Sequence, residues 1–506
     1  MKKRILTALL AAIMCQSIFT MTSCGESEVN SETTPNTQTT GTATDEVVAE
    51  TEPEEELTDL ERRQRIPDNL PDTKFDGAEF RVMTNEKTYA GFDYTTEIAV
   101  EELNGDACND ETYNRNIRIE ERFDTKISVQ SDTAPQTSVS TFVTAGTPDY
   151  QIVGFYDYIA YTPINSGVLM NWLEAPYVDL NQPWHNKLAN DAATLNNKLF
   201  AICSDLAISS MTYTHAVFAN TEMLLDYGYP IEDMYSMVRE GTWTIDKLIE
   251  MTTDMYIDKN GNGKADINDT YGFGYEITNP GDVWLTAFGG RVCTVNGSEI
   301  ELSFMNDKTV SILEKLLAWH YDNPGFEKLA TQYDEEKYFL EEKLVMAPLR
   351  FLAAYSTLRE MEAVYAMLPF PKWDEAQESY YTNADDKFTV FGLPLTSAGD
   401  IEFVSTIYEA LSAESYKTVY PAYYDQALKG KYSSDASTAE MVELIMAGRA
   451  FDFSFQFGES CFQRLPYMLR DALKNNKPNL ASDYKKLEKV LAKSMDRILA
   501  KAYDLD

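Results

Sequence analysis

The sequence lacks the motifs on which many catalytic sites depend. It contains no GxSxG, HExxH, GxGxxG or Walker A pattern, which argues against serine hydrolases, zinc proteases and nucleotide-binding enzymes. Only 3 histidines occur in 506 residues, and they are isolated from one another. The 43 Lys and Arg residues are outnumbered by 81 Asp and Glu residues, so we expect no binding to nucleic acid or to anionic lipid.

Cysteine is also scarce. Two of the 6 cysteines lie near the N-terminus, and the other four are widely spaced: Cys108, Cys203, Cys293 and Cys461. This spacing excludes a zinc ribbon and a CxxC redox motif. In an exported protein the four could form up to two disulfides, but free buried thiols fit equally well. Their pairing is therefore left open by the sequence.

The N-terminus has the pattern of a lipoprotein signal peptide. Three cations precede an apolar run over residues 5–19, which is too short for a stable membrane span. No other apolar stretch is long enough to span a membrane either. The sequence MTSC then forms a lipobox, in which Met21 stands where Leu is commoner. We predict removal of residues 1–23, lipidation of Cys24, and anchoring on the outer face of the cell membrane, which is periplasmic if the source is Gram-negative.

Residues 24–67 are predicted to form a disordered acidic tether after the lipidated Cys24. From Gly25 to about Leu60 there is no aromatic residue and no Lys or Arg, whereas Thr, Ser, Pro and Glu are frequent. Such a segment cannot bury a hydrophobic core. The rest of the chain is long enough for two large lobes.

Strands that alternate with helices predict an α/β fold. A helix over residues 110–123 separates the first two of four apolar strand segments, at 80–83, 127–129, 150–154 and 198–203. Ligands of such sheets bind at the carboxyl ends of the strands. Tyr156, Asp157 and Tyr158 directly follow the third strand, so we expect them at the rim of a ligand-binding cleft.

The segment 241–276, GTWTIDKLIEMTTDMYIDKNGNGKADINDTYGFGYE, joins a helix, an acidic loop and a strand. Thr244 suits the N-cap of the helix. The loop has the D-x-N-x-N-G-x-x-D-x-x-D spacing of an EF-hand-type site, so we predict a structural Ca²⁺. Side-chain oxygens and one backbone carbonyl, that of Lys264, would bind it: Asp258, Asn260, Asn262, Lys264, Asp266 and Asp269. Asp at the last position, where Glu is usual, shortens the bidentate reach, and an acidic turn without metal is the alternative.

The same segment resembles extracellular solute-binding proteins of family 1, the receptors that deliver sugars to ABC importers. GTWT, the Asp-rich loop, YGF and the sequence LPFPK at 368–372 carry the resemblance. It implies the two-lobed type II periplasmic-binding-protein fold with hinge crossings. Extended segments at 214–220 and 388–394 are similar to the family's crossings. Lobe one would then span residues 68–216 and 390–430, and lobe two residues 217–389 and 431–506, including the helix at 482–499.

The resemblance also suggests ligand contacts. Residues 279–290, NPGDVWLTAFGG, are similar to the helix start that supplies a stacking tryptophan in maltose-binding-type receptors, which suggests Trp284. A tryptophan of the core is the equal alternative. Arg350 matches a family position beside the cleft, where it could hold hydroxyls or a uronate carboxylate, and a surface ion pair is the alternative.

Three functions stay open. The first is a receptor without catalysis, which binds a sugar or oligosaccharide and delivers it to an ABC transporter permease. The second is a lipid-anchored extracellular glycan hydrolase, since 81 carboxylates include many possible pairs. The third is a glycan-sensing surface lipoprotein without a transporter.

Overall fold

The computed structural model describes residues 58–86, 91–359, 361–424 and 436–505. The predicted signal peptide, Cys24 and most of the predicted tether lie outside these residues. Within them, no helix combines the length and the apolar character needed to cross a membrane. The described thiols of Cys108, Cys203, Cys293 and Cys461 are all buried and form no disulfide.

The first lobe is built on a five-stranded sheet in the order β2-β1-β3-β13-β4. The strands are β1 (Ala78–Asn85), β2 (Thr125–Asp132), β3 (Ile152–Tyr156), β4 (Ala201–Ile202) and β13 (Thr389–Gly392). The first three pair in parallel, as the βαβ pattern predicted, and β13 runs antiparallel between β3 and β4. The helices of this lobe include α3 (Ala107–Phe123), α4 (Pro135–Ala145), α5 (Tyr161–Ser166), α6 (Lys187–Ala193), α15 (Ile401–Lys417) and α16 (Val419–Tyr423).

The second lobe has a six-stranded sheet, β10-β7-β11-β5-β12, with β6 beside β7. The strands are β5 (His215–Asn220), β6 (Tyr256–Ile257), β7 (Thr270–Tyr275), β10 (Phe326–Lys328), β11 (Leu344–Arg350) and β12 (Tyr365–Leu368). Every residue of β5, β7, β11 and β12 is buried, because helices and loops cover both faces of the sheet. The predicted N-cap is confirmed, since the Thr244 side chain accepts a hydrogen bond from the backbone of Lys247.

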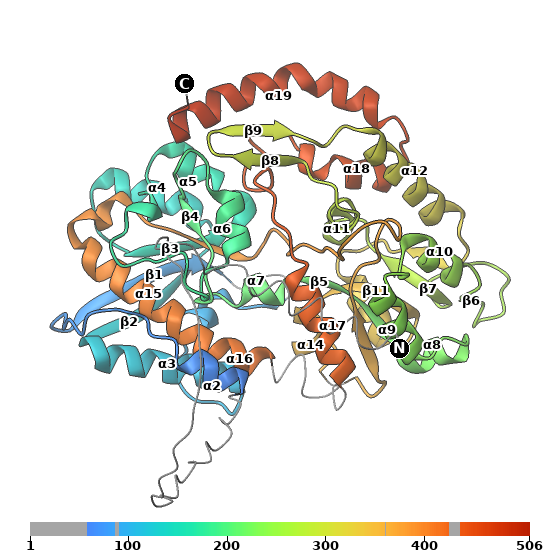
Figure 1. The fold of residues 1–506 in the computed structure, drawn as a ribbon, viewed down its shortest axis with the longest axis horizontal. Coiled ribbons are helices and arrows are strands. Elements are labelled where there is room, and N and C mark those ends of the chain that lie inside the picture. Colours follow the sequence, from blue (N-terminus) through green and yellow to red (C-terminus); the bar gives the residue numbers. More distant parts are fainter. Residues whose placement is uncertain (1–57, 87–90, 360, 425–435, 506) are drawn as a thin grey trace, which may run out of the picture. The chain divides into compact units, whose positions relative to one another are not determined.

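The remaining helices and one hairpin complete the described part of the chain (Figure 1). They are α2 (Asp59–Gln64), α7 (Ser209–Thr212), α8 (Thr221–Asp226), α9 (Ile231–Glu240), α10 (Ile245–Thr253), α11 (Asn279–Ala287), the hairpin β8 (Cys293–Asn296) and β9 (Glu299–Leu302), α12 (Asp307–Asp322), α13 (Asp334–Leu340), α14 (Phe351–Tyr355), α17 (Ala436–Ala447), α18 (Met468–Lys474) and α19 (Leu480–Tyr503). Short 3₁₀ turns occur at η1 (Tyr94–Glu97), η2 (Asp157–Ile159), η3 (Trp172–Glu174), η4 (Leu395–Asp400) and η6 (Leu465–Tyr467).

Two crossing segments pass between the sheets side by side. The chain leaves the first lobe after α7 and enters β5, and it returns through residues 382–388 into β13. The backbones of Thr214 and Ala384 form an antiparallel bridge, and the Asp385 amide donates to the Tyr213 carbonyl at 2.9 Å. A third segment joins them where Thr382 pairs with Arg449. The expected later crossing at 431–440 lies partly outside the described residues.

The C-terminal helix α19 contacts both lobes, whereas we expected it on lobe two alone. Near its start, the Tyr484 ring stacks on Phe304 of the second lobe, with centroids 6.2 Å apart. At its end, Tyr503 is fully buried against Phe200 of the first lobe, and its carbonyl accepts a hydrogen bond from Asn196 at 2.8 Å. The apolar stripe of α19 is therefore too long for one lobe to cover, and the helix runs across to the other (Figure 1).

Candidate functional site

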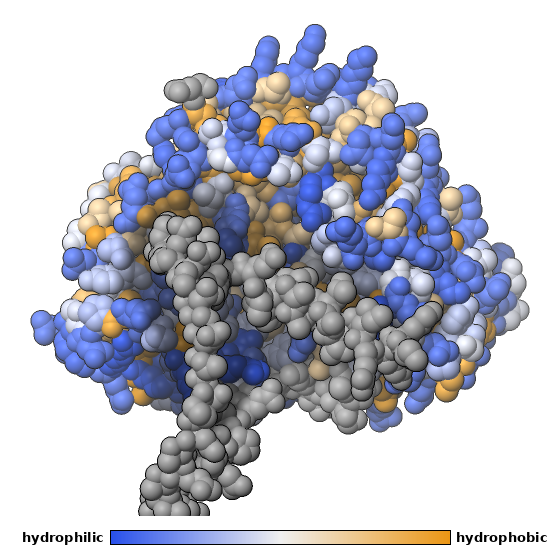
Figure 2. All heavy atoms as spheres, viewed as in Figure 1, coloured by the Kyte–Doolittle hydropathy of each residue, from blue (hydrophilic) through white to orange (hydrophobic). Residues whose placement is uncertain are grey.

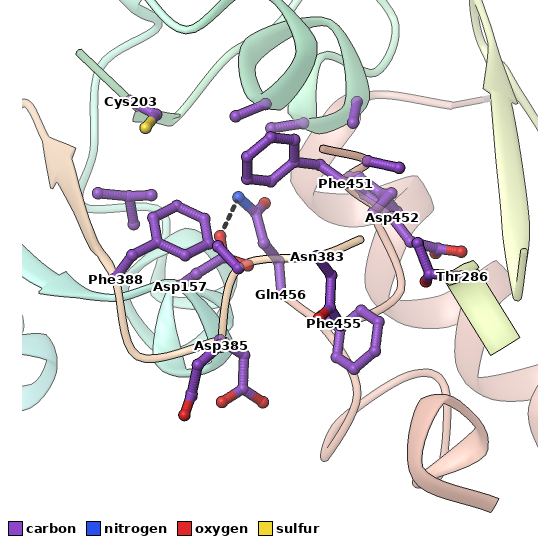
Figure 3. Close-up of a pocket in the computed structure, with 18 of the residues that line it drawn as sticks. Asp157, Cys203, Thr286, Asn383, Asp385, Phe388, Phe451, Asp452, Phe455 and Gln456 are labelled. Carbon is purple, nitrogen blue, oxygen red and sulfur yellow. Dashed lines mark hydrogen bonds between the residues drawn. The ribbon is translucent and has the colours of Figure 1, made fainter. Parts of the chain in front are cut away.

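A cleft lies between the two sheets (Figure 3). The end of β3 and helix α6 line it from the first lobe, and α11 lines it from the second. Two further segments, 383–390 and 450–456, complete the wall. The lining consists mainly of carboxylates, amides and phenyl rings: Asp157, Asn190, Asn279, Asp282, Thr286, Arg291, Asn383, Asp385, Asp386, Phe388, Phe451, Asp452, Phe453, Phe455 and Gln456. In the view of Figure 2, apolar and hydrophilic residues are both visible inside the central hollow of the surface.

Asp157 is the one predicted rim residue that lines this cleft. It follows β3 directly, is 7% exposed, and accepts a hydrogen bond at 2.7 Å from the Gln456 amide (Figure 3). Burial disfavours the charged carboxylate and raises the pKa of Asp157 to about 7, an effect that Asp386 strengthens and the Gln456 hydrogen bond opposes. Asp157 therefore keeps its proton up to near neutral pH.

Asp385 and Asp386 are adjacent in the returning crossing but differ in ionisation. Asp385 accepts a hydrogen bond from the Asn279 amide at 2.6 Å. Burial opposes its charge, but the positive side chains of Lys387 and Arg350 outweigh burial and lower the pKa of Asp385. Burial and the neighbouring Asp385 charge raise the pKa of Asp386 to about 7. The Asp386 carboxylate accepts its hydrogen bond from Tyr467 at 2.8 Å.

Helix α11 presents one face to the cleft. Asp282 and Thr286 line the cleft from positions four residues apart, which lie on the same side of a helix. Arg470 donates to Asp282 at 2.6 Å, yet burial raises the pKa of Asp282 well above its ordinary range. The second oxygen of Asp282, Oδ1, has no hydrogen-bond partner among the described residues, and neither has Oε1 of Gln456.

Phenyl rings occupy the wall beside these polar groups. Phe451 and Phe455 are each partly exposed and come from the same segment as Gln456. The Phe451 ring meets Phe388 edge to face at 5.6 Å, and Phe455 meets Tyr467 at 5.6 Å. Their neighbour Phe453 is buried and stacks on Phe457. The cleft thus offers flat apolar faces next to hydrogen-bond acceptors.

Trp284 does not line the cleft, so our expectation that it stacks on a ligand is not supported. Its side chain is 0% exposed, and its Nε1 donates to the Tyr275 hydroxyl at 2.6 Å. Trp319 packs against the ring edge to face at 5.4 Å. The reason is helical geometry: Trp284 lies two residues from both Asp282 and Thr286, and therefore on the opposite face of α11. It is a core tryptophan.

Tyr156 and Tyr158 are half-buried beside the cleft but do not line it. Their rings stack on each other, with centroids 5.9 Å apart and an angle of 10° between the planes. Tyr156 also meets Tyr94 edge to face at 5.1 Å. Tyr156 and Tyr158 lie at the edge of the sheet where the strand direction predicted them. Both rings, however, pack against other side chains of the protein and do not face the cleft.

Arg350 lies behind the cleft rather than in it. It is 3% exposed, which excludes the surface ion pair, and it lines a neighbouring cavity of about 200 Å³. Its guanidinium donates to Glu336 at 2.8 Å, lies 3.9 Å from Asp385 and covers the Tyr333 ring at 4.4 Å. Arg350 therefore acts on the cleft through Asp385, whose negative charge it stabilises.

The predicted calcium loop lies between β6 and β7. Asp258 accepts hydrogen bonds from the backbones of Gly261 and Gly263 at 2.7 and 2.8 Å. Asp266 accepts from the amide side chains of Asn260 and Asn262, and Asp269 accepts from the backbones of Lys259 and Asp266. The Lys264 amide donates to Asn262. Among the described residues no group of three or more His, Cys, Asp and Glu side chains is placed to hold a metal ion. In this arrangement the loop's side-chain oxygens accept hydrogen bonds from the loop's own donors.

The comparisons with known proteins support the fold. No protein-family model matches the chain, and no curated protein matches it. Among solved structures, the chain is similar to the ABC substrate-binding protein Lmo0181 from Listeria monocytogenes, determined in complex with cycloalternan. The TM-score is 0.51 at 14% identity, over 85% of this chain and 100% of that chain. The expected α/β fold of a solute-binding protein is thereby confirmed.

The first prediction concerns the acidic loop. From its ligand spacing we propose that Ca²⁺ binds there by replacing the internal hydrogen bonds. Calcium at about 100 times its Kd would then stabilise the fold by about 2.7 kcal/mol, and EDTA would lower the melting temperature. Asp258→Ala should remove this response, whereas Asp254→Ala, outside the ligand positions, should keep it. A melting curve that EDTA leaves unmoved would show a plain acidic turn.

The second prediction concerns Asp157 and pH. An Asp whose pKa is raised to about 7 in the folded state holds a proton that the unfolded chain has already lost, so its stabilising effect disappears as pH rises through 7. Asp157→Asn imitates the protonated acid. The wild-type effect is complete only below about pH 4, so we expect the gain of Asp157→Asn over wild type to be larger at about pH 8 than at about pH 5 by at least about 1.4 kcal/mol.

Urea unfolding at both pH values measures this difference. The exposed Asp226→Asn serves as the matched control and should show no such pH-dependent gain. If the wild-type and Asp157→Asn stabilities change in parallel with pH, the carboxyl does not hold its proton as described.

Proposed function

We propose that this protein is a receptor that binds a sugar or oligosaccharide between its lobes and delivers it to an ABC import permease. The observation that carries the proposal is the composition of the cleft. Partly exposed phenyl faces at Phe451 and Phe455 lie beside buried oxygens of Gln456 and Asp282 that lack partners. Pyranose rings offer the complement, since their C–H faces are apolar and their hydroxyls donate hydrogen bonds.

The connections between the lobes support this role. Two crossing segments and the strand-like pairing of Thr382 with Arg449 join two separate sheets, an arrangement suited to closure over a ligand. The fold is that of an ABC substrate-binding protein, and the one cited above was determined with an oligosaccharide bound. This fold and the resemblance in sequence support delivery to a permease.

The proposal places the receptor on the outer face of the cell membrane. The motivation is the MTSC lipobox after a short apolar run, with Cys24 as the lipidated residue and the acidic segment after it as a tether. We predict that Cys24→Ala releases the protein from the membrane fraction or leaves an uncleaved precursor. Fractionation with lipid labelling measures this, with Cys108→Ala as the matched control. A Cys24→Ala protein that still carries lipid would disprove the anchor.

A glycan hydrolase is the second candidate, and one observation favours it. Asp157 and Asp386 have pKa values raised to about 7, and the adjacent Asp385 stays ionised. Carboxyls whose environments separate their pKa values can act as acid and base. Binding without catalysis predicts no new reducing ends after long incubation with a bound glycan. A sensing role would retain binding but need no permease.

The receptor hypothesis predicts that the mature chain binds at least one neutral or charged oligosaccharide of a broad panel in calorimetric titration. Phe455→Leu keeps apolar bulk but removes a flat face, and we expect it to weaken binding about tenfold, or about 1.4 kcal/mol. Trp284→Phe is the matched control, because it changes a core ring. It should lower the melting temperature while leaving affinity nearly unchanged. Equal affinity of Phe455→Leu and wild type would remove this ring from the site.

A further inference from the structure

The charges that line the cleft are unbalanced. Among the described residues, five aspartates line it, at positions 157, 282, 385, 386 and 452, against one lining cation, Arg291. Three of the five have compensating partners. Asp282 pairs with Arg470 at 2.6 Å, Asp385 lies 3.9 Å from Arg350, and Asp452 accepts the backbone amides of residues 292 and 293 at 2.7 and 3.2 Å.

Asp157 and Asp386 are less well compensated. Within the part of the chain that the structure describes, neither forms an ion pair, and their hydrogen-bond partners are the neutral side chains of Gln456 and Tyr467. Lys387 and Arg470 favour the charged form of Asp386 from a distance, but Lys387 donates its hydrogen bond to Tyr333 and Arg470 pairs with Asp282. A buried carboxylate such as that of Asp157 is costly without a cation in contact. The two carboxyls influence each other and so share one region of the cleft.

The unpartnered atoms in the wall are acceptors. Oε1 of Gln456 and Oδ1 of Asp282 are buried without a donor, and the side chains that carry them are 5% and 8% exposed. A ligand that satisfies them must present N–H or O–H groups. An ammonium group presents three donors and no acceptor, and it supplies the missing positive charge. A single ammonium group would therefore balance the negative charge and donate to the acceptors that lack a donor.

We infer that the cleft binds a glycan carrying a protonated amino group, which lies between the carboxylates of Asp157 and Asp386. This inference rests on the proposed receptor function and narrows its substrate class to amino sugars. The flat faces of Phe451 and Phe455 favour a ring over a linear polyamine, because a ring offers a C–H face to stack on them. The raised pKa values of Asp157 and Asp386 agree with a site for a cationic group, because a carboxyl that has no cation in contact holds its proton more tightly.

Calorimetric titration of the mature chain with three trimers of one linkage tests the inference. The trimers of glucosamine, glucose and N-acetylglucosamine share a backbone and differ in the group at one ring carbon. Galactosamine and galactose extend the comparison to a second ring. We expect the amine to bind at least about tenfold tighter than its neutral counterparts, the typical worth of one charge-assisted hydrogen bond.

Isosteric variants assign the residues. Asp157→Asn and Asp386→Asn should each reduce the ratio of the affinity for the amine to the affinity for its neutral counterparts at least about tenfold. The exposed Asp226→Asn should leave the preference intact. Thermal melting verifies that each variant is folded. The titration of the wild-type chain with the three trimers does not depend on the folding of any variant.

Each other outcome overturns a distinct part. If a neutral trimer binds as tightly as the amine, this inference fails and the receptor function stands. A preference for the amine that survives in both variants would refute the assignment to Asp157 and Asp386. If no glycan of the wider panel binds, or spermidine alone binds, the proposed function and this inference fail together.

Discussion

The cleft depends on the pairing of two crossing segments between the sheets. The backbone bridge of Thr214 with Ala384 and the hydrogen bond from Asp385 to Tyr213 fix where the chain leaves and re-enters the first lobe. Asp385 also receives the Asn279 amide from the start of α11, so one buried residue links the crossing to the second lobe. Arg350 keeps this carboxylate ionised from behind. Removing that charge would leave the Asn279 amide without its acceptor and the buried Arg350 with one nearby carboxylate fewer.

Much of the architecture was predictable because it follows from local periodicity. The parallel strands β1, β2 and β3 and the capped helix α10 have apolar patterns and cap residues that act over a few positions. Asp157 was predictable for the same reason, since the end of a parallel strand is a fixed place in the fold. The antiparallel β13 was expected only as a crossing, because its partner strands are far away in the sequence.

The rest of the site depends on orientation and on long-range contacts. The sequence of α11 alone did not show which face of the helix lines the cleft. The polar Asp282 and Thr286 lie on that face, whereas Trp284 packs in the core. The segment 450–456 was not predicted at all. Its aromatic residues resemble an ordinary core strand, and only long-range contacts such as that between Gln456 and Asp157 bring part of it to the cleft. The run Asn383 to Asp386, directly before a crossing, was a signal that sequence reasoning could have used.

The helix α19 has a consequence for the kinetics of ligand exchange. Its last turn contacts the first lobe through Tyr503 and Asn196, and the backbone amide of Asn196 also donates to the Gly297 carbonyl of the β8–β9 hairpin at 2.8 Å. Any separation of the lobes at this margin must carry the end of the helix along or detach it. Fraying of a helix terminus is among the least costly local openings in a protein. The residence time of a bound solute would then be set at the C-terminus, far along the chain from the residues that recognise it.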